Sequence, residues 1–269
     1  MLRKPRTAAA RVGYAKWGRT PFSSWSLEKK GYGPFLLRLM LGVLSLSPVL
    51  LAQARGAQPP SKTPRDGALV DITGYWVSIV SEDWRFRMVT APKGDYPDVP
   101  LNAEGKKIAD AWDPAKDEAS PDRCKAYGAP NLMRVPARFH ITWADDTTLK
   151  IETDAGMQTR LLRFSTPPPN TRPQRQGFSA ARWEGRGALK VVTTHLLPGY
   201  LQSNGVPHSG NATMTEYFDV VKETNGDQWL IVDAVVEDPQ YLMRSFVRST
   251  HFRKQPDATG WDPSPCVVR

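Results

Sequence analysis

The segment 178–219 constrains the fold most strongly, because it contains short runs of alternating apolar and polar residues separated by turn signals. Side chains of a β-strand point alternately to its two faces, so such runs are typical of strands buried on one side. Gly185 and Gly187 can supply the positive φ angles that a tight hairpin needs. We therefore expect two antiparallel strands that meet at this turn, and a third strand over 213–221.

Similar signals recur along most of the chain after residue 70. Asn225-Gly226 is a strong hairpin dipeptide, and Asp145-Asp146 marks another turn. Apolar and basic residues alternate over 84–88, which predicts a further half-buried strand, and a last strand is expected over 245–252. Together these patterns predict about nine strands.

One helix is expected among these strands, over 102–112. Asn102 can cap its first turn, and Pro114 ends it. Strands that follow one another through short turns favour an up-and-down meander, and a long sheet usually closes on itself to remove its edges. The predicted fold is mainly β, an antiparallel up-and-down barrel with one short helix. A two-sheet β-sandwich is the alternative.

Residues 1–54 have the layout of a secretory signal peptide. They hold nine of the 36 Lys and Arg residues and one of the 27 Asp and Glu residues, and they end in the cleavage-site pattern Ala52-Gln53-Ala54. Arg38 and Pro48 interrupt the apolar run, which then falls short of the roughly 20 residues of a membrane span. We expect a periplasmic or secreted bacterial protein without a membrane span after cleavage; a membrane anchor is the alternative.

The rest of the chain divides into a polar linker, 55–69, and a single β-rich domain, 70–269. The charges of this part nearly balance, so no nucleic-acid partner is expected. Two cysteines in an oxidising compartment usually pair, which predicts a disulfide between Cys124 and Cys266. Their spacing does not fit a metal site, and the chain has no cofactor-binding motif, so neither a metal nor a cofactor is expected.

The strand pattern brings two polar residues to an apolar face. Glu216 lies between apolar neighbours on its strand, and alternation over 189–195 points His195 inward on the preceding strand. A buried carboxylate needs a partner, so His195 and Glu216 are predicted to pair, and the imidazole is then a candidate general base. The alternative interpretation is a histidine that only satisfies a polar group in the interior. His208 is expected in an exposed loop.

A barrel interior of this kind suits a small, largely apolar ligand. The candidate ligand-binding residues are Trp76, Arg182, Trp183, His195, Glu216 and Tyr217. The expected function is ligand binding in the cell envelope. One alternative is a hydrolase or isomerase that uses the pair His195 and Glu216. Another is a structural or partner-binding envelope protein whose barrel is filled by its aromatic side chains.

Several short motifs resemble known proteins. Gly74-Tyr75-Trp76 resembles the G-x-W start of lipocalin-like (calycin) barrels, which implies an architecture and no function. A longer set resembles a family of secreted bacterial proteins that carries no assigned activity. This set consists of TGYW at 73–76, WEG at 183–185, LKVVTTH at 189–195, NGVP at 204–207, ATMTEYF at 212–218 and EDPQYL at 237–242. The resemblance covers nearly all of 71–269 and implies one exported domain.

Overall fold

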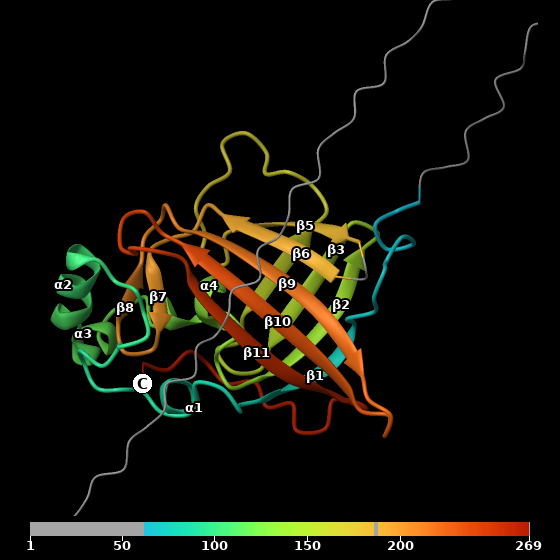
Figure 1. Cartoon of the computed structure of the whole chain (residues 1–269), viewed down its shortest axis with the longest axis horizontal. Helices are drawn as coiled ribbons and strands as arrows, with labels where there is room; N and C mark the ends of the chain where they lie inside the picture. The colour runs from blue at the N-terminus through green and yellow to red at the C-terminus, as the bar shows by residue number, and fades with distance from the viewer. Residues whose placement is uncertain (1–61, 186–187, 269) are drawn as a thin grey trace, which may run out of the picture. The chain divides into compact units, whose positions relative to one another are not determined.

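The computed structural model describes residues 62–185 and 188–268, which form a closed β-barrel with a small second sheet and short helices (Figure 1). The strand order around the barrel is β1-β11-β10-β9-β6-β5-β4-β3-β2. The barrel strands are β1 (Gly74–Ile79), β2 (Arg138–Asp145), β3 (Thr148–Thr153), β4 (Thr159–Arg163), β5 (Phe178–Glu184), β6 (Ala188–Thr194), β9 (Thr213–Lys222), β10 (Gln228–Glu237) and β11 (Phe246–Gln255).

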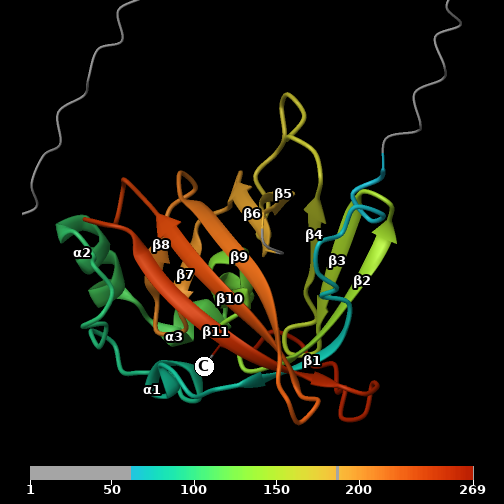
Figure 2. The ribbon, with the colours of Figure 1, turned by 45° about the vertical axis from the view of Figure 1, so that its right-hand side comes forward.

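The helices and the second sheet gather at one end of the barrel, as Figures 1 and 2 show. They are α1 (Trp84–Arg87), α2 (Ala103–Ala111), α3 (Pro114–Glu118), the 3₁₀ helix η1 (Lys125–Tyr127), α4 (Ala129–Leu132), β7 (Gly199–Gln202) and β8 (Val206–His208). The predicted helix is α2, and the Asn102 side chain caps it by accepting a hydrogen bond from the Gly105 amide at 2.9 Å. The other helical segments are too short to show a helical period in the sequence.

The predicted barrel is confirmed, but its strands are not purely antiparallel. β4 and β5 pair in parallel, through Leu162 with Ser179 and Arg163 with Ala180. A parallel pair needs a crossover that returns the chain to the same end of the sheet, and the Pro-rich segment 164–177 provides it. β6 pairs with β9, because β7 and β8 form a sheet of their own between them in the chain. The up-and-down order was therefore wrong at these two places.

The strand predicted over 84–88 was also wrong. Trp84–Arg87 forms α1, which starts after Asp83, a residue in the left-handed region with φ 50°. Arg87 turns inward, and its Nε donates to the carbonyl oxygen of Arg134 at 2.8 Å. The apolar Trp84 and Met88 are exposed instead. Alternation alone could not show that here the basic residue is the buried one.

The hairpin predictions hold where the structure describes them. Across β5 and β6, Trp183 lies opposite Leu189 and Glu184 opposite Ala188, while residues 186–187 of the predicted turn lie outside the described residues. β9 and β10 form a continuous ladder, and Gly226 in the connecting turn has φ 91°. Glycine adopts this conformation without a steric penalty.

The predicted leader, 1–54, and residues 55–61 of the linker lie outside the described residues. The second part of the linker contacts the barrel: the carbonyl oxygen of Pro64 accepts a hydrogen bond from Trp183 Nε1 at 2.7 Å. The Arg65 amide also donates to the carbonyl oxygen of Asp146, in the β2–β3 turn, at 3.1 Å. Within 62–185 and 188–268, no helix has the length and apolar character needed to cross a membrane.

The barrel interior is filled by side chains. Trp76, Phe139, Phe218 and Phe252 each have 0 % exposed surface. A side chain that borders a void large enough for water keeps some accessible surface, so these four rings border no such void. The centre of the barrel is packed like the interior of an ordinary globular domain.

One ion pair crosses this packed interior. Arg160 of β4 and Glu216 of β9 are each 1 % exposed. Arg160 Nη1 donates to Glu216 Oε1 at 3.1 Å, and its Nη2 donates to Oε2. The same guanidinium donates to Ser179 Oγ of β5 at 3.1 Å and to Thr193 Oγ1 of β6 at 2.8 Å. The pair therefore connects four strands, on both sides of the parallel seam between β4 and β5.

We expect Glu216→Ala to lower the free energy of unfolding by about 3–5 kcal/mol, because it leaves the Arg160 guanidinium buried without its counter-charge. Urea unfolding of the wild type and the variant measures the difference. The double variant Arg160→Met/Glu216→Leu should recover most of the loss, since it removes both charges. A loss in Glu216→Ala of less than about 1 kcal/mol, the scale of exposed pairs, would contradict this role.

The predicted disulfide between Cys124 and Cys266 is confirmed. The two residues are 142 positions apart, so the bridge closes a loop that contains β2 through β11. Closing a loop of this length restricts the unfolded chain, with a stabilisation of about 5 kcal/mol in the chain-entropy model.

Replacing both cysteines by serine should therefore lower the free energy of unfolding by about 5 kcal/mol. The measurement is urea unfolding of the oxidised wild type beside Cys124→Ser/Cys266→Ser. Adding a reductant should bring the wild type to the stability of the variant and leave the variant unchanged. Equal stabilities without reductant would contradict the expectation.

Candidate functional site at the barrel mouth

His195 and Glu216 do not meet, so the predicted pair was wrong. His195 follows the last residue of β6 and has φ 55°, which breaks the strand alternation that would have turned it inward. Its Nδ1 lies 2.8 Å from Thr194 Oγ1. Glu216 does face the interior, as predicted, but its carboxylate is bonded to Arg160. The partner of the buried acid is thus an arginine on β4 and not a residue of the neighbouring strand β6.

The other predicted ligand-binding residues are dispersed. Arg182 is on the outer surface, where it pairs with Glu184. Tyr217 also faces outward, with Lys190 Nζ 5.1 Å from its ring centre. Trp183 is half-buried against the linker, whereas Trp76 is fully buried in the barrel. The four side chains are thus divided between the outer surface and the interior of the barrel, and a role in ligand binding stays a prediction.

His208 was expected in an exposed loop, which was wrong. It is the last residue of β8, it is 1 % exposed, and its Nδ1 lies 3.1 Å from the carbonyl oxygen of Ser209. Burial lowers the pKa of His208, because it disfavours the charged imidazolium, and the Ser209 carbonyl opposes this shift. The short β7–β8 sheet, which has no clear alternation in the sequence, is what buries the residue.

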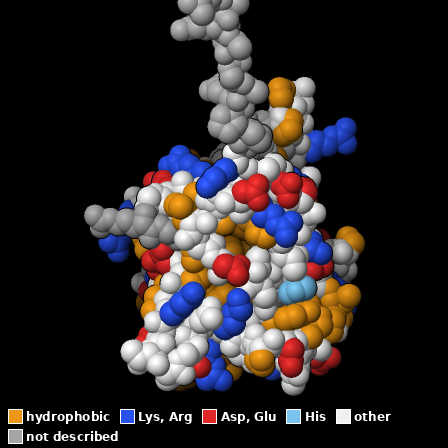
Figure 3. All heavy atoms as spheres, turned by 90° about the vertical axis from the view of Figure 1, so that its right-hand side faces the viewer, with side chains coloured by type: hydrophobic (Ala, Val, Ile, Leu, Met, Phe, Trp, Pro, Cys, Tyr) orange, Lys and Arg blue, Asp and Glu red, His pale blue; other side chains and the backbone are white. Residues whose placement is uncertain are grey.

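A cavity of about 540 Å³ opens at one end of the barrel. This end, where β9 is joined to β10, lies away from the helices (Figures 1 and 2). We call it the barrel mouth. Its lining residues are Leu69, Val70, Asp71, Val220, Lys222, Gln228 and Lys254. They come from the segment before β1, the end of β9, the start of β10 and the end of β11. Figure 3, which shows the right-hand face of Figure 1, has Lys, Arg, Asp and Glu side chains interspersed with apolar surface.

Strand alternation places the polar residues of the mouth. Phe218 and Val220 face inward on β9, so Lys222 continues their row. Phe252 faces inward on β11, and Lys254 is the next residue of its row. An inward row that changes from aromatic to lysine marks the point where the interior meets solvent. The strand predicted from the sequence ends at residue 252 and therefore leaves out Lys254.

Lys254 is held in place by two contacts. Its Nζ lies 4.8 Å from the ring centre of Trp76 and donates a hydrogen bond to the carbonyl oxygen of Thr73. Burial lowers the pKa of Lys254; the charge of Asp71 opposes this shift, and that of Lys222 adds to it. The ammonium group thus covers the face of the buried indole and forms part of the floor of the mouth.

Asp71 supplies the negative charge of the mouth. Its Oδ1 accepts hydrogen bonds from the Thr73 hydroxyl at 2.7 Å and the Thr73 amide at 2.9 Å. Burial alone would raise the pKa of Asp71, but the bonds from Thr73 and the charges of Lys254 and Lys222 lower it. The lining therefore carries two cationic groups and one anionic group, beside the apolar Leu69, Val70 and Val220.

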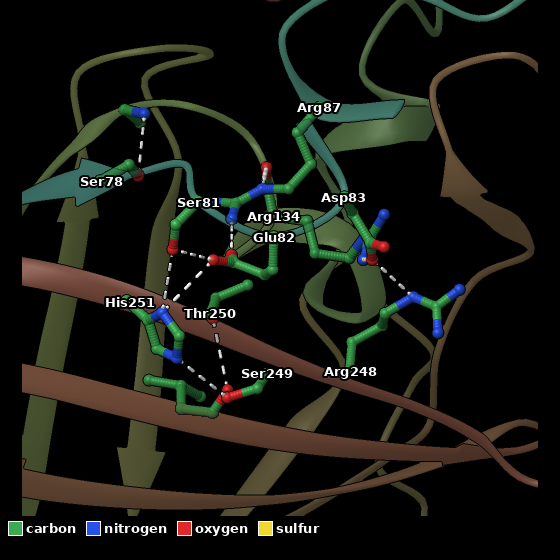
Figure 4. A network of polar contacts seen from close by, with 12 residues as sticks. Ser78, Ser81, Glu82, Asp83, Arg87, Arg134, Arg248, Ser249, Thr250 and His251 are labelled. Atoms are coloured by element: carbon green, nitrogen blue, oxygen red, sulfur yellow. Dashed lines mark hydrogen bonds and ion pairs between the residues drawn. The ribbon is translucent and has the colours of Figure 1, made fainter. Parts of the chain in front are cut away.

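A second polar arrangement has the residue types of a hydrolytic triad but not its geometry. Glu82 Oε2 lies 3.3 Å from His251 Nδ1, and Ser249 Oγ lies 3.4 Å from His251 Nε2 (Figure 4). Ser249 is in the middle of β11, opposite Asp233 in the β10–β11 ladder. Both contacts of His251 are longer than the roughly 2.6–3.2 Å hydrogen bonds that join nucleophile, base and acid in such triads. We interpret this arrangement as part of a structural network.

The described residues contain no group of three or more His, Cys, Asp or Glu side chains placed to hold an ion. No family model matches the chain, and a search of curated proteins finds no match to it. The class that fold and site define is a β-barrel protein with a filled centre and an open, cationic mouth.

Lys254 gives the mouth a testable pH dependence. The folded-state pKa lies below the ordinary 10.5, so between these two values the unfolded state binds more protons than the folded state. The free energy of unfolding contributed by this group therefore rises as pH rises through that window. Wild type should gain stability relative to Lys254→Met between about pH 7 and about pH 10.

Urea unfolding at the two pH values measures this gain. Lys150→Met is the matched control, because Lys150 is on the outer face of β3 and does not line the mouth. A wild-type curve that runs parallel to that of Lys254→Met over the whole range would contradict the assignment.

Proposed function

We propose that the chain is an exported β-barrel protein that binds a small, largely apolar molecule with an anionic group at the barrel mouth. The observation that carries this proposal is the 540 Å³ cavity into which the inward rows of β9 and β11 bring Lys222 and Lys254. Cavities of this size are typical of sites for small organic ligands.

Because the centre of the barrel is packed, we place the binding site at the mouth and not in the deep interior. Trp76 and Phe252 have no exposed surface, so a ligand could not pass them without displacing well-packed rings. A molecule at the mouth would instead rest its apolar part on Leu69, Val70 and Val220. Binding of this kind uses the open end of a lipocalin-like barrel and not its deep calyx.

The charges of the mouth favour an anionic head group. Two ammonium groups face one carboxylate, and that carboxylate is already bonded to Thr73. A ligand carboxylate would therefore meet one excess positive charge. Lys254 is held at the floor by the Thr73 carbonyl, so its ammonium group is oriented before the ligand arrives.

Export to the bacterial cell envelope is part of the proposal. The signal-like layout of residues 1–54 supports it, and so does the disulfide between Cys124 and Cys266, since such bridges persist in oxidising compartments. The motifs that resemble a family of secreted bacterial proteins agree with the same location.

The filled interior favours a second candidate, a structural or partner-binding envelope protein with no small ligand. In that case the mouth would be the solvent-exposed end of a stable barrel, and its lysines would keep the end soluble. The hydrolase or isomerase predicted from His195 and Glu216 has no such support, because the two side chains are held by other partners.

Binding of decanoate, decanol and decylamine distinguishes the two candidates, because these ligands share a tail and differ in head group. Decanoate should bind about tenfold more tightly than decanol, and decylamine more weakly than either, as one charge-assisted hydrogen bond predicts. Displacement of a fluorescent fatty acid measures all three affinities.

The matched variants are Lys254→Met in the mouth and Lys150→Met on the outer face of β3. Lys254→Met should remove the preference for decanoate, and Lys150→Met should leave it unchanged. Equal affinity for all three ligands, or no binding, would contradict the proposal, and the second outcome would favour the filled structural barrel.

A further inference from the structure

A narrow cleft lies at the helical end of the molecule, away from the barrel mouth. We call it the arginine cleft. Its walls come from α1, η1, the segment after α4, β7 and the C-terminal segment, and they include Phe86, Arg87, Lys125, Tyr127, Arg134 and Tyr200. The cleft leaves about 20 Å³ in which the centres of water-sized groups can lie. One water needs roughly 10–15 Å³ on this measure, so there is room for one or two such groups.

Two buried arginines in this cleft have unused hydrogen-bond donors. Arg87 and Arg134 are 4 % and 5 % exposed. Arg87 uses Nε for the Arg134 carbonyl oxygen and Nη1 for Glu82, while its Nη2 has no partner among the described residues. Arg134 uses Nη1 for Asp83 at 3.0 Å, and neither its Nε nor its Nη2 has a partner in that part of the chain.

The unused donors of Arg134 form one edge of its guanidinium group. Nε and Nη2 point in the same direction and can bind the two oxygens of one oxyanion side by side. Buried donors are rarely left without an acceptor in folded proteins, because nothing then compensates for the lost hydration. Arg87 lines the same cleft, and its Nη2 is a further donor without a partner in the described part of the chain.

Charge decides which oxyanion suits the cleft. Figure 4 shows Glu82 between Arg87 and His251, and Asp83 between Arg134 and Arg248. Each cleft arginine is thus already opposite one carboxylate, so a doubly charged phosphate would find little excess positive charge. The space also matches two oxygens better than the four oxygens of a phosphate.

The carboxylate of Asp117, on the opposite wall of the cleft, does not bind the two arginines. Asp117 accepts hydrogen bonds from Lys125 Nζ at 2.6 Å, Tyr200 Oη at 2.6 Å and Trp112 Nε1 at 2.9 Å. Burial alone would raise the pKa of Asp117, but these three donors lower it. Lys125 and Tyr200 are therefore held by Asp117, and the donors left for a ligand are those of Arg87 and Arg134.

The disulfide fixes the two walls relative to each other. Cys124 lies between Arg123 and Lys125, which both line the cleft, and Cys266 precedes the lining residue Val267. A site whose walls are cross-linked loses little conformational entropy when it binds.

We propose that the arginine cleft is a binding site for the carboxylate group of a small organic acid. The carboxylate oxygens accept hydrogen bonds from Arg134 Nε and Nη2 and from Arg87 Nη2. The rest of the acid extends from the cleft past Phe86 and Tyr127. This site is independent of the barrel mouth and of the function proposed for it.

The test uses acetate and acetamide, which have the same shape but differ in charge and in one acceptor oxygen. The full chain is titrated with each, at constant ionic strength maintained with chloride, and the Nε–H signals of its arginines are followed by NMR. Acetate should produce saturable shifts of the Arg87 and Arg134 signals. Equal responses to acetate and acetamide, or none beyond chloride, would overturn the proposal.

Two variants on one helix provide the matched comparison. Arg87→Lys keeps the positive charge opposite Glu82 but removes the Nη2 donor, so acetate should bind about tenfold more weakly. Arg85→Gln is the control, because Arg85 is exposed, bonds to Asp95 and does not line the cleft. If Arg87→Lys does not fold, Arg134→Lys takes its place, with the same expected loss.

Two further outcomes distinguish a carboxylate site from a structural role of the arginines and from acetate binding at the barrel mouth. If the arginine variants lower thermal stability but bind acetate like the wild type, the arginines have a structural role alone and the proposal is wrong. Lys254→Met should bind acetate like the wild type. If that change at the barrel mouth abolishes acetate binding, the acetate site is the mouth, and the arginine cleft is not a carboxylate site.

Discussion

The ion pair between Arg160 and Glu216 holds the weakest part of the barrel. β4 and β5 share two residue pairs in their ladder, whereas β9 and β10 share ten. Arg160 reaches from β4 across this short seam to β5, β6 and β9. A barrel has no free edges if its ladder is continuous, and here a side-chain network supplements the ladder where backbone pairing is shortest. The filled centre and the open mouth both require this closure.

The pattern of strands and faces was readable from the sequence, because strand alternation is local. It placed Glu216 inside, as observed, and predicted the hairpin in which Trp183 of β5 lies opposite Leu189 of β6. It could not identify Arg160 as the partner of Glu216, since that contact depends on the crossover between β4 and β5. The same limit applies to Arg87, which is buried by a contact with the distant Arg134. The prediction for His195 failed for a local reason, its left-handed backbone.

The two ends of the barrel separate the apolar interior from solvent in different ways. At one end the helices, β7 and β8 cover the interior, and buried arginines are balanced by Glu82 and Asp83. At the other end the interior row changes to lysines that reach solvent. Neither set of basic residues could be recognised as a site in the sequence, because each becomes informative when its neighbours in space are known.

The disulfide also divides the chain topologically. Of the described barrel strands, β2 through β11 lie within the covalent ring that Cys124 and Cys266 close, and β1 lies outside it. β1 is hydrogen-bonded to β11 on one side and to β2 on the other, so it fills the slot between the first and last strands of the ring. In topological terms, eight barrel strands lie in one covalent ring, and β1 completes the barrel from outside that ring. Such an arrangement lends itself to splitting before residue 124, with β1 supplied on a separate fragment together with α1, α2 and α3.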